Sequence, residues 1–246
     1  MIDLKLDIDS VSLVREISDI QRKQIPYALM LAQTRLATQR VKPGMLKVMV
    51  QRLDRPTPTT MKSPFAQAAT KQRGAKVWFK DQWTTGIPAD AYLQQAVQGG
   101  PRPHKRFEKS LIAQGLTKSG QYAIPSPGLL NQYGNVSRGV MTRILSGLGA
   151  AEGGRGYQAN ATGSKRSQCK GNAERYFVGA VDGEAGMWER KASAFGEGVK
   201  PAFIYSDGAP QYRTIFPFFK IGENIVQAQY RAELTTALRD ALSTAR

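Results

Sequence analysis

An aromatic run close to the end of the chain places the strongest constraint on its fold. The run is Tyr212-Arg-Thr-Ile-Phe-Pro-Phe-Phe-Lys-Ile-Gly222, and an amphipathic pattern follows it. Its proline fixes φ and holds the preceding residue in an extended conformation, so a strand can end there and a helix can begin directly afterwards. The run therefore predicts the joint between a sheet and the last helix, with an aromatic core. The residues assigned to this joint are Phe216, Pro217, Phe218 and Phe219.

Helical patterns are found at both ends of the chain. Before the first of them, apolar and polar residues alternate, which predicts a strand with Ile2, Leu4, Leu6 and Ile8 on one face. A helical stripe then runs from about Ser10 to Leu36. Pro26 either kinks this helix or opens a second one, and Pro43-Gly44 is expected to end it. The C-terminal helix is predicted from Ile221 onwards, with leucines and closely spaced alanines that allow close contact with a neighbour.

Strand patterns flank a less regular middle region. Residues 65–70 and 76–81 predict a hairpin with its loop at 71–75, in which Val77 and Phe79 share one face and Trp78 lies on the other. Residues 174–181, 186–192 and 201–206 predict an antiparallel meander that contains Trp188. Trp78, Phe79 and Trp188 are assigned structural roles.

These patterns together predict an α+β fold. An antiparallel sheet is expected to be packed by a long N-terminal helix and a C-terminal helix, in a single domain of residues 1–246. Residues 84–172 lack the strand pattern and are interpreted as a helical and glycine-rich loop insertion. Its helices are expected at 89–97, 104–114 and 137–148.

The charge balance points to polyanionic neighbours. The chain has 246 residues with 35 Lys and Arg against 19 Asp and Glu, a formal net charge of +16. Such an excess favours contact with nucleic acid or an acidic protein surface. No apolar run approaches a membrane span, and the first residues lack the apolar block of a signal peptide. We therefore expect a soluble protein that is not exported and does not bind membranes.

Catalytic and metal-binding patterns are weak. Cys169 and His104 are the only residues of their types, so a disulfide framework and a structural zinc site are not expected. Gly154-Arg-Gly156 lacks the strand and helix of a dinucleotide site, and Ser167-Gln-Cys-Lys170 falls in a predicted loop. We assign no catalytic, cofactor-binding or metal-binding residues. A Cys169-dependent hydrolase is the third-ranked alternative.

Basic residues next to aromatic ones leave a nucleic-acid-binding interpretation open. They occur in His104-Lys-Arg-Phe107 and in Lys76-Val-Trp-Phe-Lys80, and stacking combined with phosphate contacts is a known binding mode. The glycine-rich segment 149–172 is predicted to be a mobile loop, and its basic residues are candidates for contact with DNA or with other subunits. These residues are Arg155, Lys165, Arg166 and Lys170.

Several short phrases, spread from about Pro26 to the C-terminus, resemble one family. They are Asp54-Arg-Pro-Thr-Pro58, Ala69-Thr-Lys71, Val77-Trp-Phe-Lys-Asp81, Gly99-Gly-Pro-Arg102 with Lys105-Arg-Phe-Glu108, Tyr133-Gly-Asn-Val-Ser-Arg-Gly139, Tyr176-Phe-Val-Gly179, Trp188-Glu-Arg190 and Phe216-Pro-Phe-Phe219. The resemblance is to structural proteins of tailed bacteriophages of the neck or tail-completion type, similar to the minor tail protein Z group.

The resemblance implies a non-enzymatic virion protein of α+β fold. It implies a homo-oligomeric ring in the neck or tail region that connects portal or head-completion proteins to tail proteins and leaves a channel for the genome. Such a subunit would assemble in the host cytoplasm, need no cofactor and touch genomic DNA only non-specifically. The alternative is a basic nucleic-acid-binding protein that acts in phage packaging or regulation.

Overall fold

The chain forms two compact units of mixed α+β structure. The computed structural model describes Ser18 and residues 20–82, 86–150, 175–193 and 196–244. One unit comprises Met1–Gln98 and Ile215–Arg246, and the other comprises Gly99–Thr214. The α+β class and the antiparallel pairing agree with the prediction. The division differs from the expected single domain with an insertion at 84–172, because the second unit also contains the predicted meander.

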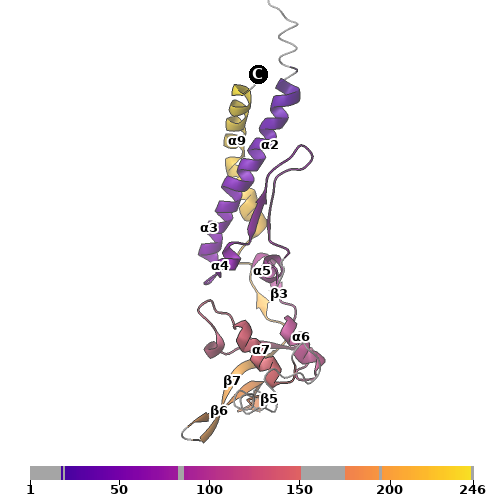
Figure 1. Cartoon of the computed structure of the whole chain (residues 1–246), viewed down its shortest axis with the longest axis vertical. Helices are drawn as coiled ribbons and strands as arrows, with labels where there is room; N and C mark the ends of the chain where they lie inside the picture. Colours follow the sequence, from indigo (N-terminus) through magenta and orange to yellow (C-terminus); the bar gives the residue numbers. More distant parts are fainter. Residues whose placement is uncertain (1–17, 19, 83–85, 151–174, 194–195, 245–246) are drawn as a thin grey trace, which may run out of the picture. The chain divides into compact units, whose positions relative to one another are not determined.

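A long helix forms the first unit's N-terminal part. Its successive segments are η1 (Ile20–Gln24), α2 (Ile25–Arg35), η2 (Leu36–Val41) and α3 (Lys42–Arg52), of which η1 and η2 are π-helical. Figure 1 shows them as one continuous helix. Pro26 and Pro43 each lie in the first turn of an α-helical segment, where a missing N–H is best tolerated. The predicted helix end at Pro43-Gly44 is therefore wrong.

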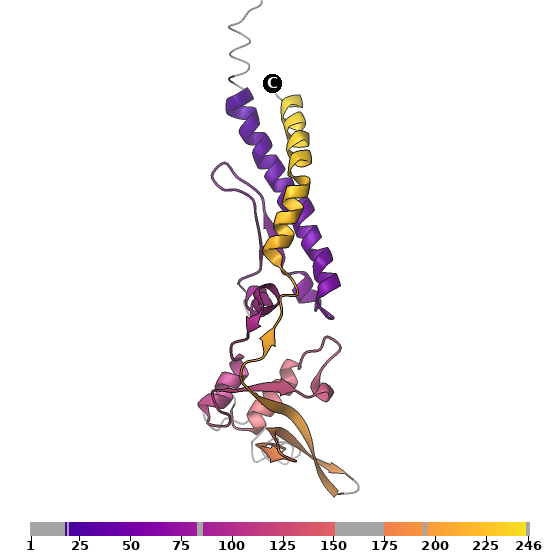
Figure 2. The ribbon, with the colours of Figure 1, turned by 180° about the vertical axis from the view of Figure 1, so that it is seen from behind.

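The C-terminal helix α9 (Phe218–Ser243) runs antiparallel to this long helix (Figures 1 and 2). Four fully buried alanines form their contact, and small side chains of this kind let two helix axes approach closely, as the sequence predicted. The alanines are Ala28, Ala32, Ala237 and Ala241. Two ion pairs flank them, Arg35 with Asp240 at 2.7 Å and Arg40 with Glu233 at 2.6 Å.

A glycine allows the close approach of α9 to α3. A Cβ added to Gly44 would lie 2.6 Å from Cδ1 of Ile225, so any larger residue would displace that side chain. The sequence favoured Gly44 as a helix terminator, but in the structure its role is to make room for α9.

A small hairpin packs on these helices and completes the first unit. Strands β1 (Pro64–Gln67) and β2 (Lys76–Phe79) pair antiparallel, and α4 (Pro58–Met61) and α5 (Ala89–Gln98) precede and follow them. The predicted hairpin is confirmed. Val77 and Phe79 face a core that includes Met45, Met49 and Phe216. The N-terminal strand predicted at residues 2–8 lies outside the described residues.

The second unit contains the main sheet, whose strand order is β4-β7-β6-β5. Its elements are β3 (Gly100–Pro101), α6 (Arg106–Ala113), β4 (Gln121–Pro125), η3 (Pro127–Leu129), α7 (Arg138–Gly147), β5 (Tyr176–Val181), β6 (Glu184–Ser193), β7 (Gly196–Asp207) and β8 (Gln211–Tyr212). The meander β5-β6-β7 and the three predicted helices are confirmed, the first of these helices being α5 of the other unit. Leu111 of α6 and Ile144 of α7 pack on Met187 and Phe203 of the sheet.

The expected partnership between sheet and terminal helices is therefore corrected. The long N-terminal helix and α9 pack on the hairpin β1–β2, whereas α6 and α7 pack on the four-stranded sheet. Local sequence patterns predicted each element but not which sheet each helix covers, since that choice depends on contacts between residues far apart in the chain.

Strands β6 and β7 come unusually close at a glycine. Gly186 faces Ile204 next to a bulge between Met187 and Trp188. A Cβ at Gly186 would overlap the carbonyl oxygen of Phe203, so this strand position requires glycine. Trp188 is buried beside it, and its indole N–H donates to the carbonyl of Gly179 at 3.0 Å. The indole of Trp188 thus links β6 to β5.

Candidate functional site

The aromatic joint before α9 divides into a buried part and an exposed part. Phe216 is 1% exposed, and the ring centroids of Phe79 lie 5.9 Å from Phe216 and 5.0 Å from Phe218. The sequence predicted a joint between a sheet and the last helix, and in the structure the joint fixes α9 to the hairpin β1–β2 instead of to the meander. Phe219 differs from the expected core position, since 74% of its surface is exposed. Pro217 directly precedes the first turn of α9.

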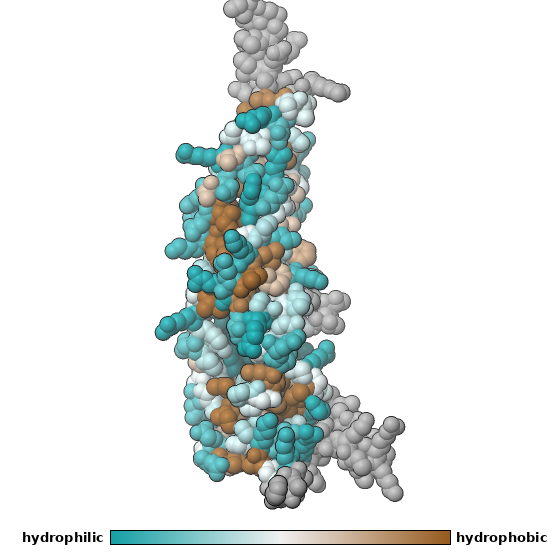
Figure 3. All heavy atoms as spheres, turned by 90° about the vertical axis from the view of Figure 1, so that its left-hand side faces the viewer, coloured by the Kyte–Doolittle hydropathy of each residue, from teal (hydrophilic) through white to brown (hydrophobic). Residues whose placement is uncertain are grey.

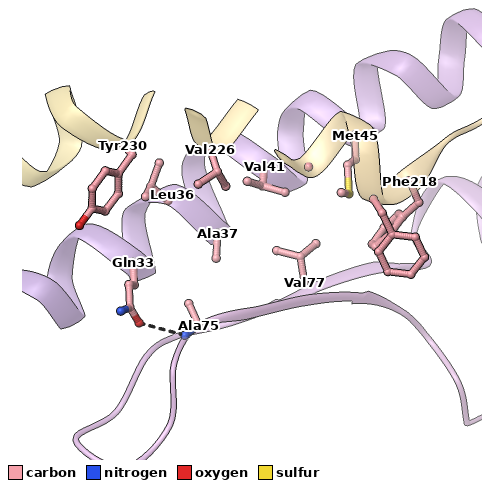
Figure 4. A pocket seen from close by; sticks show the side chains of 12 residues that line it. Gln33, Leu36, Ala37, Val41, Met45, Ala75, Val77, Phe218, Val226 and Tyr230 are labelled. Carbon is pink, nitrogen blue, oxygen red and sulfur yellow. Dashed lines mark hydrogen bonds between the residues drawn. The ribbon is translucent and has the colours of Figure 1, made fainter. Parts of the chain in front are cut away.

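An apolar groove opens where the exposed phenylalanine lies. The groove has a volume of about 360 Å³ and is lined by the long helix, by β2 and the residue before it, and by α9 (Figure 4). The helix supplies the floor with Leu36, Ala37, Val41 and Met45, and the walls include Ala75, Val77, Phe219, Val226 and Tyr230. All of these residues belong to the first unit. The sequence could not reveal the groove because its three walls come from distant segments.

The groove walls reach the protein surface. Val226 is 38% exposed and Tyr230 is 40% exposed. Gln33 closes one end, where its Oε1 accepts a hydrogen bond from the backbone N–H of Ala75 at 3.4 Å. Figure 3 shows one face of the molecule, on which hydrophobic patches interrupt a largely hydrophilic surface. Contiguous apolar surface of this kind is typical of a site that binds a protein segment or another apolar partner.

The opposite face of the hairpin is aromatic and basic. Phe65 and Trp78 are paired across the strands with ring centroids 6.0 Å apart. Lys42 and Lys80 lie over the Phe65 ring at 5.8 and 5.7 Å, and Lys76 lies over the Trp78 ring at 5.2 Å. Trp78 is thus a half-exposed part of a cationic aromatic surface, while its neighbour Phe79 is buried in the core.

Positive charge is concentrated in the segment that forms the long helix and the hairpin. Residues 20–80 contain one acidic residue, Asp54, and thirteen basic ones. The basic residues are Arg22, Lys23, Arg35, Arg40, Lys42, Lys47, Arg52, Arg55, Lys62, Lys71, Arg73, Lys76 and Lys80. Such a segment attracts acidic partners over a distance of about 10 Å at moderate salt.

A buried ion pair organises the second unit. Both Oε atoms of Glu108 accept hydrogen bonds from the guanidinium of Arg102 at 2.7 Å, and Glu108 and Arg102 are 1% and 8% exposed. The carboxylate also accepts from the backbone N–H groups of Lys105 at 2.6 Å and Ala123 at 2.9 Å. It therefore joins the start of α6 to β4. No role was assigned to Glu108 from the sequence, and its burial was not anticipated.

These contacts set the protonation behaviour of the cluster. Burial by itself raises the pKa of Glu108, but the hydrogen bonds from Arg102, Lys105 and Ala123 outweigh burial, and the pKa is lowered from its ordinary value of 4.5. Glu108 in turn raises the pKa of Arg102, while burial lowers the pKa of the Lys105 ammonium. A carboxylate with four donors is held ionised, which suits a structural anchor better than a general acid.

His104 also has a structural setting. Its ring stacks on Tyr122 with centroids 4.1 Å apart, and its Nε2 lies 2.7 Å from the carbonyl oxygen of Ser119. Its Nδ1 lies 3.8 Å from Glu108. Cys169, on which the third-ranked hydrolase alternative depends, lies outside the described residues. So do the four basic candidates for DNA or subunit contact, Arg155, Lys165, Arg166 and Lys170.

The described part of the chain lacks two other kinds of feature. Within it, no group of three or more His, Cys, Asp and Glu residues is placed to hold a metal ion. None of the helices in the same described ranges is both long and apolar enough to cross a bilayer.

Comparisons with models of known families, with curated proteins and with solved structures find no match for this chain. The surfaces of the first unit and the resemblance in sequence are therefore the features that bear on function.

Proposed function

We propose that the chain is a non-enzymatic structural subunit of a tailed-phage virion, of the neck, head-tail connector or tail-completion type. It forms a homo-oligomeric ring that joins portal or head-completion proteins to the tail and leaves a channel for DNA. It assembles in the host cytoplasm and remains in the neck or tail region of the virion.

One observation carries this proposal beyond the resemblance. The first unit exposes an apolar groove of about 360 Å³ whose walls include Phe219, Val226 and Tyr230. Exposed apolar surface of this type is costly in water and is stabilised when a partner covers it. A protein that works by forming interfaces needs such a surface, whereas a catalytic site needs converging polar groups. The buried charged cluster of Glu108 is already fully engaged in holding α6 to β4.

A phage that lacks the gene tests the proposal directly. Its lysate is examined by negative-stain electron microscopy and plaque assay, with a plasmid-borne copy of the gene as the control for polar effects. We expect separate heads and tails, or tails with abnormal ends. Infectivity should be lost and should return when the plasmid supplies the gene. Normally joined particles with full infectivity would rule out the proposed role.

A second candidate function, nucleic-acid binding, is favoured by a separate observation. Thirteen basic residues and one acidic residue lie between positions 20 and 80, and three lysines lie over the exposed Phe65 ring and the half-exposed Trp78 ring. Stacking on such rings can retain single-stranded nucleic acid. Binding titrations at several salt concentrations separate the two functions. A steep salt slope with nanomolar affinity at physiological salt supports this second function, and weak binding supports the connector.

A further inference from the structure

The groove is bordered by a strand whose outer edge is suited to receive another strand. The backbone N–H of Lys80 donates to the carbonyl of Ser63, so these two residues form a hydrogen-bonded pair. Such pairs alternate along an antiparallel ladder, and Trp78 with Phe65 is therefore the next hydrogen-bonded pair. The alternation directs the N–H and C=O of Val77 away from β1. The side chain of Val77 meanwhile lines the groove.

The side chains of β2 alternate in chemistry as well as in direction. Val77 and Phe79 face the helices, while Lys76, Trp78 and Lys80 face outwards. A matching added strand would place apolar residues over the groove. On its outer face it would carry acidic residues opposite the two lysines, because directly opposed side chains of neighbouring strands interact.

The first nine residues of the chain have this pattern. Ile2, Leu4, Leu6 and Ile8 alternate with Asp3, Lys5, Asp7 and Asp9. With the apolar set over the groove, Asp3 and Asp7 lie opposite the two lysines of β2, and Lys5 lies opposite Trp78. Because the order Asp, Lys, Asp is symmetric, this match holds whether the added strand runs parallel or antiparallel to β2.

Chain length argues that this segment reaches a neighbour's groove and not its own. Ser18 is helical in the structure, and if the helical stripe predicted from Ser10 onwards is continuous with it, Ser10 would lie about 35 Å from Gln33 at 1.5 Å per residue. Nine extended residues span at most about 30 Å. Gln33 marks the nearest end of the groove in its own chain. Residues 1–9 of the same chain would therefore be too short to cover that groove.

We propose that residues 1–9 of a second copy of the chain bind in this groove as an extended strand beside β2. The exchange of N-terminal segments then links neighbouring copies by β-augmentation, in which the backbone supplies affinity and alternate side chains supply specificity. The inference rests on the proposed function only in requiring that copies assemble with one another. It names the segment and the surface through which they do so.

Disulfide cross-linking between singly substituted chains tests the proposal. Two proteins are prepared in a Cys169→Ser background, one with Leu4→Cys and one with Val226→Cys. They are mixed and oxidised, and the products are separated by non-reducing electrophoresis. We expect a covalent dimer of the two different chains. The matched control replaces Leu4→Cys by Lys5→Cys, on the other face of the segment. About tenfold less dimer is expected, because docking brings both positions close to the groove but turns only position 4 towards Val226.

The same substitutions in one chain identify the occupant. When Leu4→Cys and Val226→Cys are combined, the proposal predicts cross-linked oligomers. A disulfide formed at the mass of a single chain would show that the segment binds its own groove and would overturn the proposal. The absence of any cross-link at position 4, in both experiments, would show that the groove receives something else and would also overturn it.

A measurement without cysteines gives an independent test. Sedimentation velocity compares the wild-type chain with the Val226→Asp variant and with the Ala232→Asp variant, which places the same charge at an exposed position of α9 outside the groove. We expect self-association to weaken at least about tenfold for Val226→Asp, because an unpaired charge would be buried, and to change little for Ala232→Asp. Equal association of the two variants would contradict the proposal. A phage without the protein that still assembles normally would refute the virion role and leave these results unaffected.

Discussion

Replacement of Glu108 by glutamine tests whether the buried ion pair holds the second unit together. The carboxylate of Glu108 accepts four hydrogen bonds, two from Arg102 and one each from the backbone of Lys105 and Ala123. Glutamine keeps the shape but loses the charge, and one of its two terminal atoms can no longer accept. The Arg102 guanidinium, 8% exposed, then remains buried without its counter-ion.

The cost of that change follows from its burial. Removal of one partner from a buried ion pair costs about 3–5 kcal/mol, because the remaining charge is uncompensated. With a urea m-value of about 1–3 kcal/mol/M, the unfolding midpoint of the second unit is expected to fall by more than about 1 M. Glu184→Gln makes the same chemical change at an exposed position of the same unit and is expected to have little effect.

The assay must report on one unit at a time. The chain has three tryptophans, of which Trp188 alone belongs to the second unit. Fluorescence of Trp188 in a Trp78→Phe, Trp83→Phe background therefore follows urea unfolding of that unit. A Glu108→Gln variant that unfolds within about 0.3 M of the Glu184→Gln control would refute the assigned role of the ion pair.

The ion pair also predicts a dependence of stability on pH. The folded-state pKa of Glu108 lies below its ordinary value of 4.5, so the unfolded chain binds a proton first as the pH falls. The stabilisation is complete above pH 4.5 and is lost as the pH falls from 4.5 through the folded pKa. Between neutral pH and the acid range, the wild-type protein should therefore lose more stability than Glu108→Gln. Parallel pH profiles of the two proteins would contradict this.

Three further predictions concern tight contacts. Gly186→Ala should lower the free energy of unfolding of the second unit by about 1–3 kcal/mol, since its Cβ overlaps a backbone oxygen. Gly198→Ala, which has an open site in the same hairpin, should not. Equal urea midpoints of the two variants would contradict this. Ala237→Leu should destabilise the helix pair by about 1–3 kcal/mol in thermal unfolding, while Ala232→Leu on the exposed face of α9 should be neutral. Equal melting temperatures of the two variants would refute the close contact. Phe218→Ala should lower the free energy of unfolding by at most about 3–5 kcal/mol, and should therefore reduce the yield of soluble protein or assembled particles before it reduces any binding activity. A stable variant defective only in DNA binding would oppose this.

Elements with strong local signals were predictable from the sequence. Pro217 between three phenylalanines indicated that the last helix follows directly; it was predicted from about Ile221 and begins slightly earlier, at Phe218. The hairpin at β1–β2 followed from alternation on both sides of a glycine-containing loop, and its inner residues Val77 and Phe79 are indeed turned to the core. These features depend on residues near one another in the chain, where periodicity and turn chemistry are decisive.

Features that depend on distant contacts were not predictable in this way. Strand β4 pairs with β7 across a gap of about eighty residues, and this pairing assigns the meander to the second unit. Three adjacent aromatics do not reveal that Phe219 alone is exposed. Glu108 was a partial exception, because it lies three residues before Leu111 and so on the same face of α6, a position that could have indicated a buried carboxylate.

The π-helical segment η2 sets the angular position of the buried stripe along the long helix. Buried residues lie at spacings of four or five positions, at Ala28, Ala32, Leu36, Val41, Met45 and Met49. In a regular α-helix a spacing of four turns the stripe by about 40° and a spacing of five by about 140°, so the stripe would wind away from its partner. The spacing of five spans η2, whose wider turns wind more slowly and reduce this drift. A single-residue deletion in η2 would rotate the alanine contact by about 100° relative to the methionines, so the straightness of the whole interface with α9 is encoded in these few residues.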